Sequence, residues 1–308
     1  MLCLVVWLAI FPLVAGESNG AGFWTKRYGS FSDSEYPIAL AVGETGQFAV
    51  FAENDGGIFR SSDYGSSWSK TAAPTELHWS SIACDKNCTR IAATVQTDPF
   101  EVLYISDDGG QSFVNMSSSG LPQTMYAQRP IASSGTGQYL VVAYSNKYGI
   151  YVSSDYGASW ENPSIADLGY NEVDVSYDGQ IAIATAIGQS CGQSTSQSCV
   201  QITTNFGNTW TSAALAVENS NFMYVAIGRS SDVMMYAVDT LNVGGLYQSM
   251  NNGATWSRLI NVPNVSLSSV TCSADGKDIL VSTFNLQGEP NAVYSSFDFG
   301  ETFSSTYE

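Results

Sequence analysis

The chain has 308 residues, of which 44% are hydrophobic and only 13% are charged. Eleven basic residues against 28 acidic residues give a formal net charge of −17 at pH 7. A surface this acidic repels phosphate backbones, so we expect no nucleic-acid partner. The 17 Tyr, 14 Phe and 7 Trp residues supply a sizeable core and favour β-strands.

The first sixteen residues form an apolar run, MLCLVVWLAIFPLVAG, that ends in small side chains. The run is short for a bilayer span, and Val14 and Gly16 stand where a signal peptidase requires small residues. We therefore predict a signal peptide at residues 1–16, with a buried strand as the alternative. A single domain would then cover residues 17–308 of a secreted protein, or one resident in the secretory pathway, without a membrane span.

Short apolar segments separated by Gly-rich turns follow the predicted leader. A strand is expected around Trp24, and the first full unit places strands at residues 37–42, 47–52 and 58–60. The first strands of the later units are expected at residues 79–84, 130–133, 173–176, 223–227 and 269–272. Alternating short strands of this kind are typical of an all-β fold.

An eight-residue motif recurs after the third strand of each unit, at intervals of roughly 45 to 50 residues, the period of a propeller blade or solenoid unit. Each copy is anchored by an Asp or Asn: Asp63, Asp108, Asp155, Asn205, Asn251 and Asp298. This side chain can accept backbone N–H groups, and a Gly two residues later supplies a left-handed conformation. The closing Trp or Phe is expected to begin the fourth strand and to bury its ring between sheets.

The motif, Ser/Thr-x-Asp-x-Gly-x-Ser/Thr-Trp/Phe, resembles the Asp-box, or BNR repeat, of sialidase-like β-propellers. The resemblance implies four-stranded antiparallel blades, with each box in the hairpin between the third and fourth strands and in a structural role. Six units predict six blades. Counting the strand around Trp24 as the remnant of another blade gives seven, the alternative.

Propeller topology sorts the loops onto two ends. The boxes share one end with the turns between first and second strands, whereas the second-to-third loops and the blade-to-blade links share the other, here called the non-box end. Ligands of propellers are generally taken up at the non-box end. The candidate residues there are largely acidic and aromatic: Glu53, Asp55, His78, Trp79, Asp98, Glu101, Tyr126, Arg129, Tyr144, Tyr170, Glu172, Asp239 and Glu289. Such a surface suits sugar rings or a basic peptide, and ordinary solvated loops are the alternative.

The cysteines and sequons also favour export. Cys84 and Cys88, and likewise Cys191 and Cys199, bracket short loops and predict two local disulfides. Neither pair has the second Cys or His pair that a zinc site needs, so we expect no metal and no cofactor. Three sequons predict N-glycosylation, at Asn87, Asn115 and Asn264.

The sequence favours binding over catalysis. Sialidases hold their substrate with three arginines, the first in a Phe/Tyr-Arg-Ile-Pro motif, whereas this chain reads Tyr36-Pro37-Ile38-Ala39. No catalytic residue is therefore carried over, and the single histidine, His78, argues against Ser-His-Asp chemistry. We predict a monomeric, non-catalytic binding or scaffold propeller for a glycan or an extracellular protein. The alternative is a glycoside hydrolase with paired carboxylates.

Overall fold

The computed structural model describes residues 37–96, 102–122, 130–145, 148–163, 168–187, 191, 198–213, 215, 221–228, 235–240, 245–262, 265–283 and 292–307. No helix within these residues has the length and apolar character needed to cross a membrane. The described chain divides into two compact units. One contains the residues up to Val142 together with Tyr151–Glu161, and the other contains Ala143–Ile150 and the residues from Asn162 onward.

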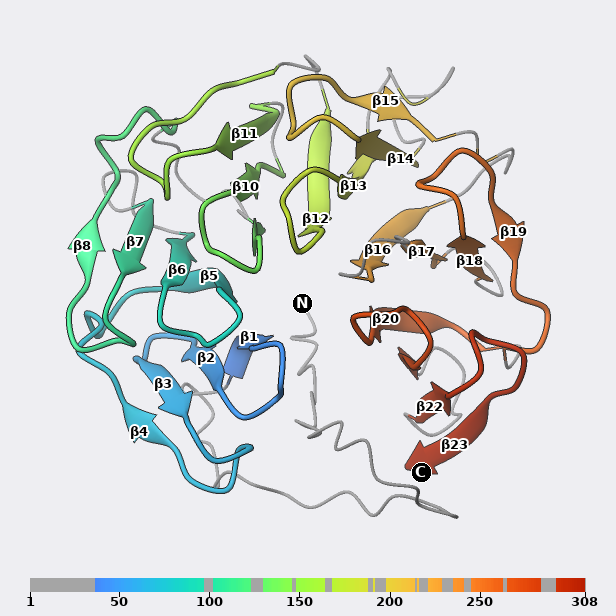
Figure 1. Ribbon diagram of the computed structural model, residues 1–308, viewed down its shortest axis with the longest axis horizontal. Coiled ribbons are helices and arrows are strands. Elements are labelled where there is room, and N and C mark those ends of the chain that lie inside the picture. Colours follow the sequence, from blue (N-terminus) through green and yellow to red (C-terminus); the bar gives the residue numbers. More distant parts are fainter. Residues whose placement is uncertain are drawn as a thin grey trace. The chain divides into compact units, whose positions relative to one another are not determined.

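The first unit contains two complete four-stranded blades and most of a third (Figure 1). Blade one comprises β1 (Pro37–Val42), β2 (Ala49–Glu53), β3 (Ile58–Ser61) and β4 (Ser69–Lys70). Blade two comprises β5 (Trp79–Cys84), β6 (Ile91–Val95), β7 (Leu103–Ser106) and β8 (Val114–Asn115). Blade three comprises β9 (Ile131–Ser133), β10 (Leu140–Ala143) and β11 (Ile150–Ser153), and an isolated bridge between Val152 and Glu161 stands in place of its fourth strand.

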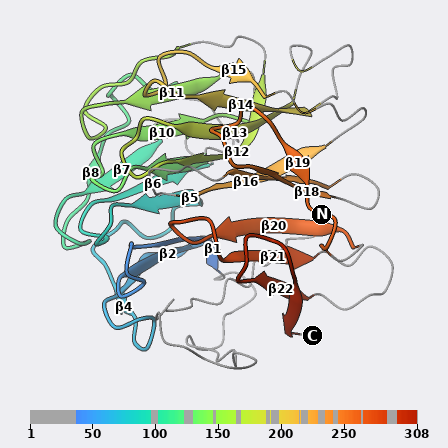
Figure 2. The same ribbon diagram turned by 45° about the vertical axis from the view of Figure 1, so that its right-hand side comes forward.

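The second unit contains three four-stranded blades. Blade four comprises β12 (Gly169–Val175), β13 (Ala182–Ile187), β14 (Ser198–Thr203) and β15 (Thr211–Ser212). Blade five comprises β16 (Phe222–Ile227), β17 (Met235–Asp239), β18 (Gly245–Ser249) and β19 (Ser257–Arg258). Blade six comprises β20 (Leu267–Cys272), β21 (Ile279–Thr283), β22 (Val293–Ser296) and β23 (Ser304–Tyr307); Figure 2 shows its first three strands from the side. The fold is therefore all-β, with the six antiparallel sheets of a six-bladed β-propeller, as the repeats predict.

Apolar side chains from neighbouring blades interleave. In the first unit Val50 and Ile58 of blade one join Trp79 and Ile91 of blade two in one buried cluster. A similar cluster in the second unit joins blade four to blade five, and another joins blade five to blade six. Blades one and two, and likewise blades four, five and six, thus bury faces against one another within their own unit. This packing explains why second strands such as β2 and β6 are buried along their whole length.

In the boxes built on Asp, the hydrogen bonds follow one pattern. In blade one the Ser61 hydroxyl donates to Asp63 Oδ1 (2.8 Å) and accepts the N–H of Gly65 (2.8 Å). Asp63 Oδ1 also accepts the N–H of Ser67 (2.8 Å), and its Oδ2 accepts the Ser67 hydroxyl (2.6 Å). Each box lies after the third strand, as the resemblance implies. Two details differ from expectation: the closing aromatic precedes the fourth strand, and its indole N–H donates to the box Gly carbonyl in Trp68, Trp210 and Trp256.

The residue before the box Gly is also left-handed, which the sequence did not predict. It is Tyr64, Tyr156, Phe206, Asn252 or Phe299, with φ between 56° and 65°, and in blade two it is Gly109. Its N–H donates to the chain just after the turn that joins first and second strands, for example from Tyr64 to the Gln47 carbonyl (3.0 Å). This bond places box and turn at the same end of a blade.

Both predicted disulfides are present, Cys84–Cys88 with a Cα–Cα distance of 4.8 Å and Cys191–Cys199 with 5.2 Å. The first strands of the later blades also match their predictions closely, except that β12 begins at Gly169 rather than at residue 173. The four added residues, Gly169 to Glu172, pair with β13 across a β-bulge between Tyr170 and Glu172, and β5 has a bulge at the equivalent place. Tyr170 and Glu172 consequently lie within a strand instead of on a blade-to-blade link.

Candidate functional site

At the non-box end of blade one, the β2–β3 loop is joined to the link that leads into blade two. Asn54 and His78 form an isolated antiparallel bridge. Asp55 stands at a left-handed φ of 53°, accepts a hydrogen bond from Asn54 Nδ2 (3.1 Å), and pairs its carboxylate with His78 Nδ1. The side chains of His78 and Asp55 are 45% and 40% exposed, so this pair presents charge to solvent from a fixed backbone.

Glu53 and Trp79 lie beneath the same loop. The Trp79 ring is 1% exposed, meets Tyr104 edge-on with centroids 5.7 Å apart, and donates its indole N–H to the Gly56 carbonyl (3.4 Å). The loop folds closely over Glu53, because a Cβ on Gly56 would lie 2.7 Å from Glu53 Oε2. These two candidates therefore support the loop from below, and the ring of Trp79 is covered by protein.

Three further candidates lie in the second unit. The N–H of Tyr170 donates to the Tyr144 carbonyl (2.8 Å), and both side chains are fully buried. The Tyr170 hydroxyl has no hydrogen-bond partner within the described chain, and burial raises its pKa. Asp239 is 8% exposed and accepts the backbone N–H of Asn221 (2.8 Å). The rings of Tyr144 and Tyr170 are therefore covered by protein, and Asp239 holds the backbone just before β16.

Glu172 and Asp174 on β12, together with Tyr224 on β16, form a group called here the Glu172 cluster. Burial and, secondly, the charge of Asp174 raise the pKa of Glu172 to about 8, so its carboxyl is largely protonated at pH 7. Asp174 accepts two backbone N–H groups, from Val175 (2.8 Å) and Ile227 (3.0 Å). Burial and then Glu172 raise the pKa of Tyr224. The sequence reading missed Asp174 and Tyr224, although the i, i+2 spacing of Glu172 and Asp174 on a strand was a usable signal.

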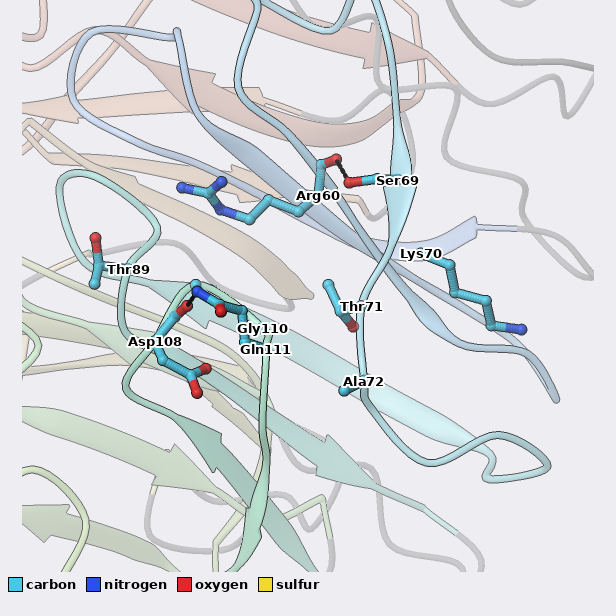
Figure 3. Close-up of a pocket in the computed structure, with 10 residues that line it drawn as sticks. Arg60, Ser69, Lys70, Thr71, Ala72, Thr89, Asp108, Gly110 and Gln111 are labelled. Atoms are coloured by element: carbon cyan, nitrogen blue, oxygen red, sulfur yellow. Dashed lines mark hydrogen bonds between the residues drawn. The ribbon is translucent and has the colours of Figure 1, made fainter.

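A cleft of about 470 Å³ opens between blades one and two at the box end (Figure 3). One wall is the chain from Ser69 to Ala72 on and after β4, and the opposite wall is the blade-two box from Asp108 to Gln111. The walls meet where Ala72 N donates to the Gly110 carbonyl (2.8 Å). Arg60 and Thr89 complete the lining, so this cleft lies away from the predicted ligand end.

The other sequence predictions lie partly outside the described residues. These are the signal peptide, the strand around Trp24, and the candidates Asp98, Glu101, Tyr126, Arg129, Glu289 and Asn264. Of the remaining sequons, Asn87 and Asn115 are exposed. Asn115 is already engaged, because its Nδ2 donates to the Tyr104 hydroxyl (3.4 Å) and its Oδ1 accepts the N–H of Ser117 (2.9 Å).

No family model matches the sequence, and no curated protein matches it either. Solved structures with similar folds include a GH74 xyloglucanase from Xanthomonas campestris, with 14% identity, a TM-score of 0.65, and coverage of 90% of this chain and 46% of that one. A GH74 enzyme from Niastella koreensis gives 14% identity, a TM-score of 0.66, and coverage of 88% and 47%. YCF48 bound to D1 peptide gives 13% identity, a TM-score of 0.62, and coverage of 89% and 83%.

These similarities show the β-propeller fold. This chain spans less than half of the length of either GH74 enzyme, but it covers more than four fifths of the YCF48 chain. The neighbours thus include both hydrolases and a propeller that holds a peptide.

Proposed function

We propose that this protein is a secreted, non-catalytic binding propeller that recognises a glycan or an extracellular protein through its non-box end. The observation that carries the proposal is the state of the described acidic candidates there. Asp55 is paired with His78, Asp239 is bound to backbone, and Glu53 is buried under its own loop. Carboxylates engaged as those of Asp55 and Asp239 are poor nucleophiles or bases, whereas an exposed charged pair suits recognition.

Two further observations support the proposal. Local disulfides suit an oxidising compartment, and the chain carries a signal-like leader. Among the similar folds is YCF48 bound to D1 peptide, of which this chain covers 83%. A net charge of −17 favours a neutral or basic ligand over an acidic one at most of the surface.

Glycoside hydrolysis is the second candidate, and the Glu172 cluster favours it. A hydrolase needs one protonated carboxyl as general acid and a second carboxylate as base or nucleophile. The raised pKa of Glu172 fits the first role, and Asp174 is two residues away on the same strand. The similarity of the fold to GH74 enzymes makes xyloglucan a suitable probe substrate.

The test combines binding and turnover on the mature protein. A printed glycan array and a library of extracellular-domain proteins would report binding, and release of reducing sugar from xyloglucan would report hydrolysis. We expect binding that falls at least ~10-fold in the double variant Asp55→Asn, His78→Gln, since charged hydrogen bonds contribute at this scale. The variant Glu172→Gln should bind normally.

Opposite results would overturn the proposal. Sugar release that disappears in Glu172→Gln would assign hydrolysis instead. Binding that survives unchanged in the Asp55→Asn, His78→Gln variant would move the site away from the blade-one loop. Circular dichroism of both variants checks that the blades remain folded.

A further inference from the structure

Arg60 is an unpaired, half-buried cation in a strongly acidic protein. The chain carries 28 acidic and 11 basic residues. Arg90, for comparison, pairs its Nε with Asp107 (2.7 Å). In the described part of the chain, Arg60 has no carboxylate within ion-pair distance. A partly desolvated charge without a counter-charge costs free energy, so binding of an anion at Arg60 would be favourable.

The Arg60 guanidinium is held in a fixed orientation. Its Nε donates to the Cys88 carbonyl (3.2 Å) and its Nη2 to the Asn87 carbonyl (3.4 Å), both in the disulfide turn of blade two. The group also stacks over the Phe48 ring, 4.8 Å from the centroid. These contacts use two of the five N–H donors of arginine and leave three without an acceptor among the described residues.

The uncommitted donors belong to the cleft between blades one and two. Figure 3 shows the Arg60 side chain extending toward Thr89 and the blade-two box, whereas Lys70 points to the opposite side. Asp108 is nearby but its carboxylate is already engaged: Oδ1 accepts the Ser106 hydroxyl (2.8 Å) and Ser112 N–H (2.9 Å), and Oδ2 accepts the Ser112 hydroxyl (2.6 Å). The local hydrogen bonding therefore leaves Arg60 available to an external anion.

We propose that this cleft is a binding site for a carboxylate-bearing sugar, a uronic acid unit, with Arg60 as the group that holds the carboxylate. A planar guanidinium with free N–H groups matches a carboxylate in a two-point contact. The volume of about 470 Å³ lies within the ~300–1,000 Å³ range of small-molecule sites.

The rest of the lining favours a sugar over a peptide. Exposed Thr89 and Gln111 provide a hydroxyl and an amide oxygen to sugar hydroxyls, while Ala72 is the one aliphatic side chain of the lining. A peptide would require apolar anchor pockets that this lining does not supply. The site is also separate from the non-box end, so the proposal stands independently of the function proposed above.

The test is titration of the mature, disulfide-bonded protein with D-glucuronate, followed by calorimetry and by the NMR signals of the arginine Nε–H groups. We expect saturable binding of glucuronate and a shift of one arginine signal, with D-glucose giving neither. Arg60→Gln should weaken glucuronate binding at least ~10-fold. Lys277→Gln removes one positive charge at an exposed position outside this lining, so it should bind as the wild type does.

A second variant and a second ligand separate loss of binding from loss of folding, and a sugar from a peptide. Because Arg60 also holds the disulfide turn, Arg60→Lys serves as a second variant that keeps the charge and loses the planar fork; it should bind more weakly than the wild type. Absence of glucuronate binding to the wild type, or equal binding by Arg60→Gln, would overturn the proposal. Arg60-dependent binding of the dipeptide aspartyl-glutamate without glucuronate binding would equally overturn the assignment to a sugar.

Discussion

The box is built on Asp in blades one, two, three and six and on Asn in blades four and five. The two types share one backbone geometry, but donor and acceptor are exchanged in one of their hydrogen bonds. In blade three the Ser159 hydroxyl donates to Asp155 Oδ2 (2.5 Å). In blade four Asn205 Nδ2 donates to the Thr209 hydroxyl instead (2.9 Å), and blade five repeats this with Asn251 and Thr255 (2.8 Å). Rotation of one hydroxyl is enough to exchange a carboxylate for an amide.

The comparison separates what the box requires from what it tolerates. Both types keep the Oδ1 acceptor for the N–H four residues later, at 2.9 Å in Asp155 and 3.0 Å in Asn205. Both also keep the left-handed pair of residues that ends in Gly, with φ of 85° at Gly157 and 80° at Gly207. The charge is therefore dispensable for the shape, and the turn backbone is the shared requirement.

The largest expected loss of stability follows from replacing the left-handed Gly that both box types share. Gly157→Ala in an Asp box and Gly253→Ala in an Asn box would each place a Cβ against the Cδ1 of an isoleucine in the preceding blade, Ile105 and Ile202 respectively. Backbone strain and overpacking together should lower the free energy of unfolding by about 2–5 kcal/mol in both variants. Urea unfolding measures it.

Two controls separate strain from overlap. Gly120→Ala meets nothing nearer than the Trp160 carbonyl oxygen at 3.9 Å, so it should show the strain alone. Ile105→Val removes the colliding Cδ1 and should recover part of the loss when combined with Gly157→Ala. Losses that differ widely between Gly157→Ala and Gly253→Ala would contradict a common backbone requirement.

The blades could be predicted from the sequence because each box forms through contacts between residues that are close in the chain. A short polar side chain, a Gly at the left-handed position and a closing aromatic recur in register, and each acts within one turn. Local disulfides were also predictable, since Cys84 and Cys88 are four residues apart and their turn closes by itself. Such features need no knowledge of distant contacts.

The candidate site depended on contacts that a single sequence does not reveal. Glu172 lies on a strand because it pairs with Thr185 of β13, and the pKa of Tyr224 is raised by burial and then by Glu172 of another blade. Arg60 adjoins a box and reads as a structural residue, and its significance depends on the carbonyls that orient it from blade two. Conversely, Trp79, Tyr144 and Tyr170 were predicted as ligand-face aromatics, and their side chains are buried.

A smaller effect, on the pH dependence of stability, is expected from the charge that distinguishes Asp boxes from Asn boxes. Hydrogen bonds, first from the hydroxyls of Ser67 and Ser112 respectively, lower the pKa of Asp63 and Asp108 to about 2. Because these folded-state values lie below the ordinary value of 3.8, their contribution to stability is present above about pH 4 and is lost as the pH falls through 2. Wild-type protein binds protons at Asp63 and Asp108 when it unfolds in this pH range. The double variant Asp63→Asn, Asp108→Asn should therefore bind up to about two fewer protons on unfolding than the wild type does.

Urea midpoints between pH 7 and pH 2 would show this as a flatter acid limb than that of the wild type. The matched control is Glu44→Gln with Glu76→Gln, which changes the charge equally at two exposed acids outside the boxes. An acid limb as steep in the box variant as in this control would contradict the role assigned to the box carboxylates.

The smallest expected change in stability comes from converting an Asn box into an Asp box. Asn251→Asp should turn the Thr255 hydroxyl into a donor, as Thr302 is to Asp298 Oδ2 (2.6 Å) in blade six. Stability at pH 7 should change by less than about 1 kcal/mol, because one hydrogen bond replaces another. The hydroxyl of Thr302, its N–H and then the Ser296 hydroxyl lower the pKa of Asp298, so the carboxyl introduced by Asn251→Asp should also titrate below the ordinary value. The ¹³C shift of this introduced carboxyl during an acid titration measures its pKa directly, and an ordinary or raised pKa would mean that the two box types are not interchangeable.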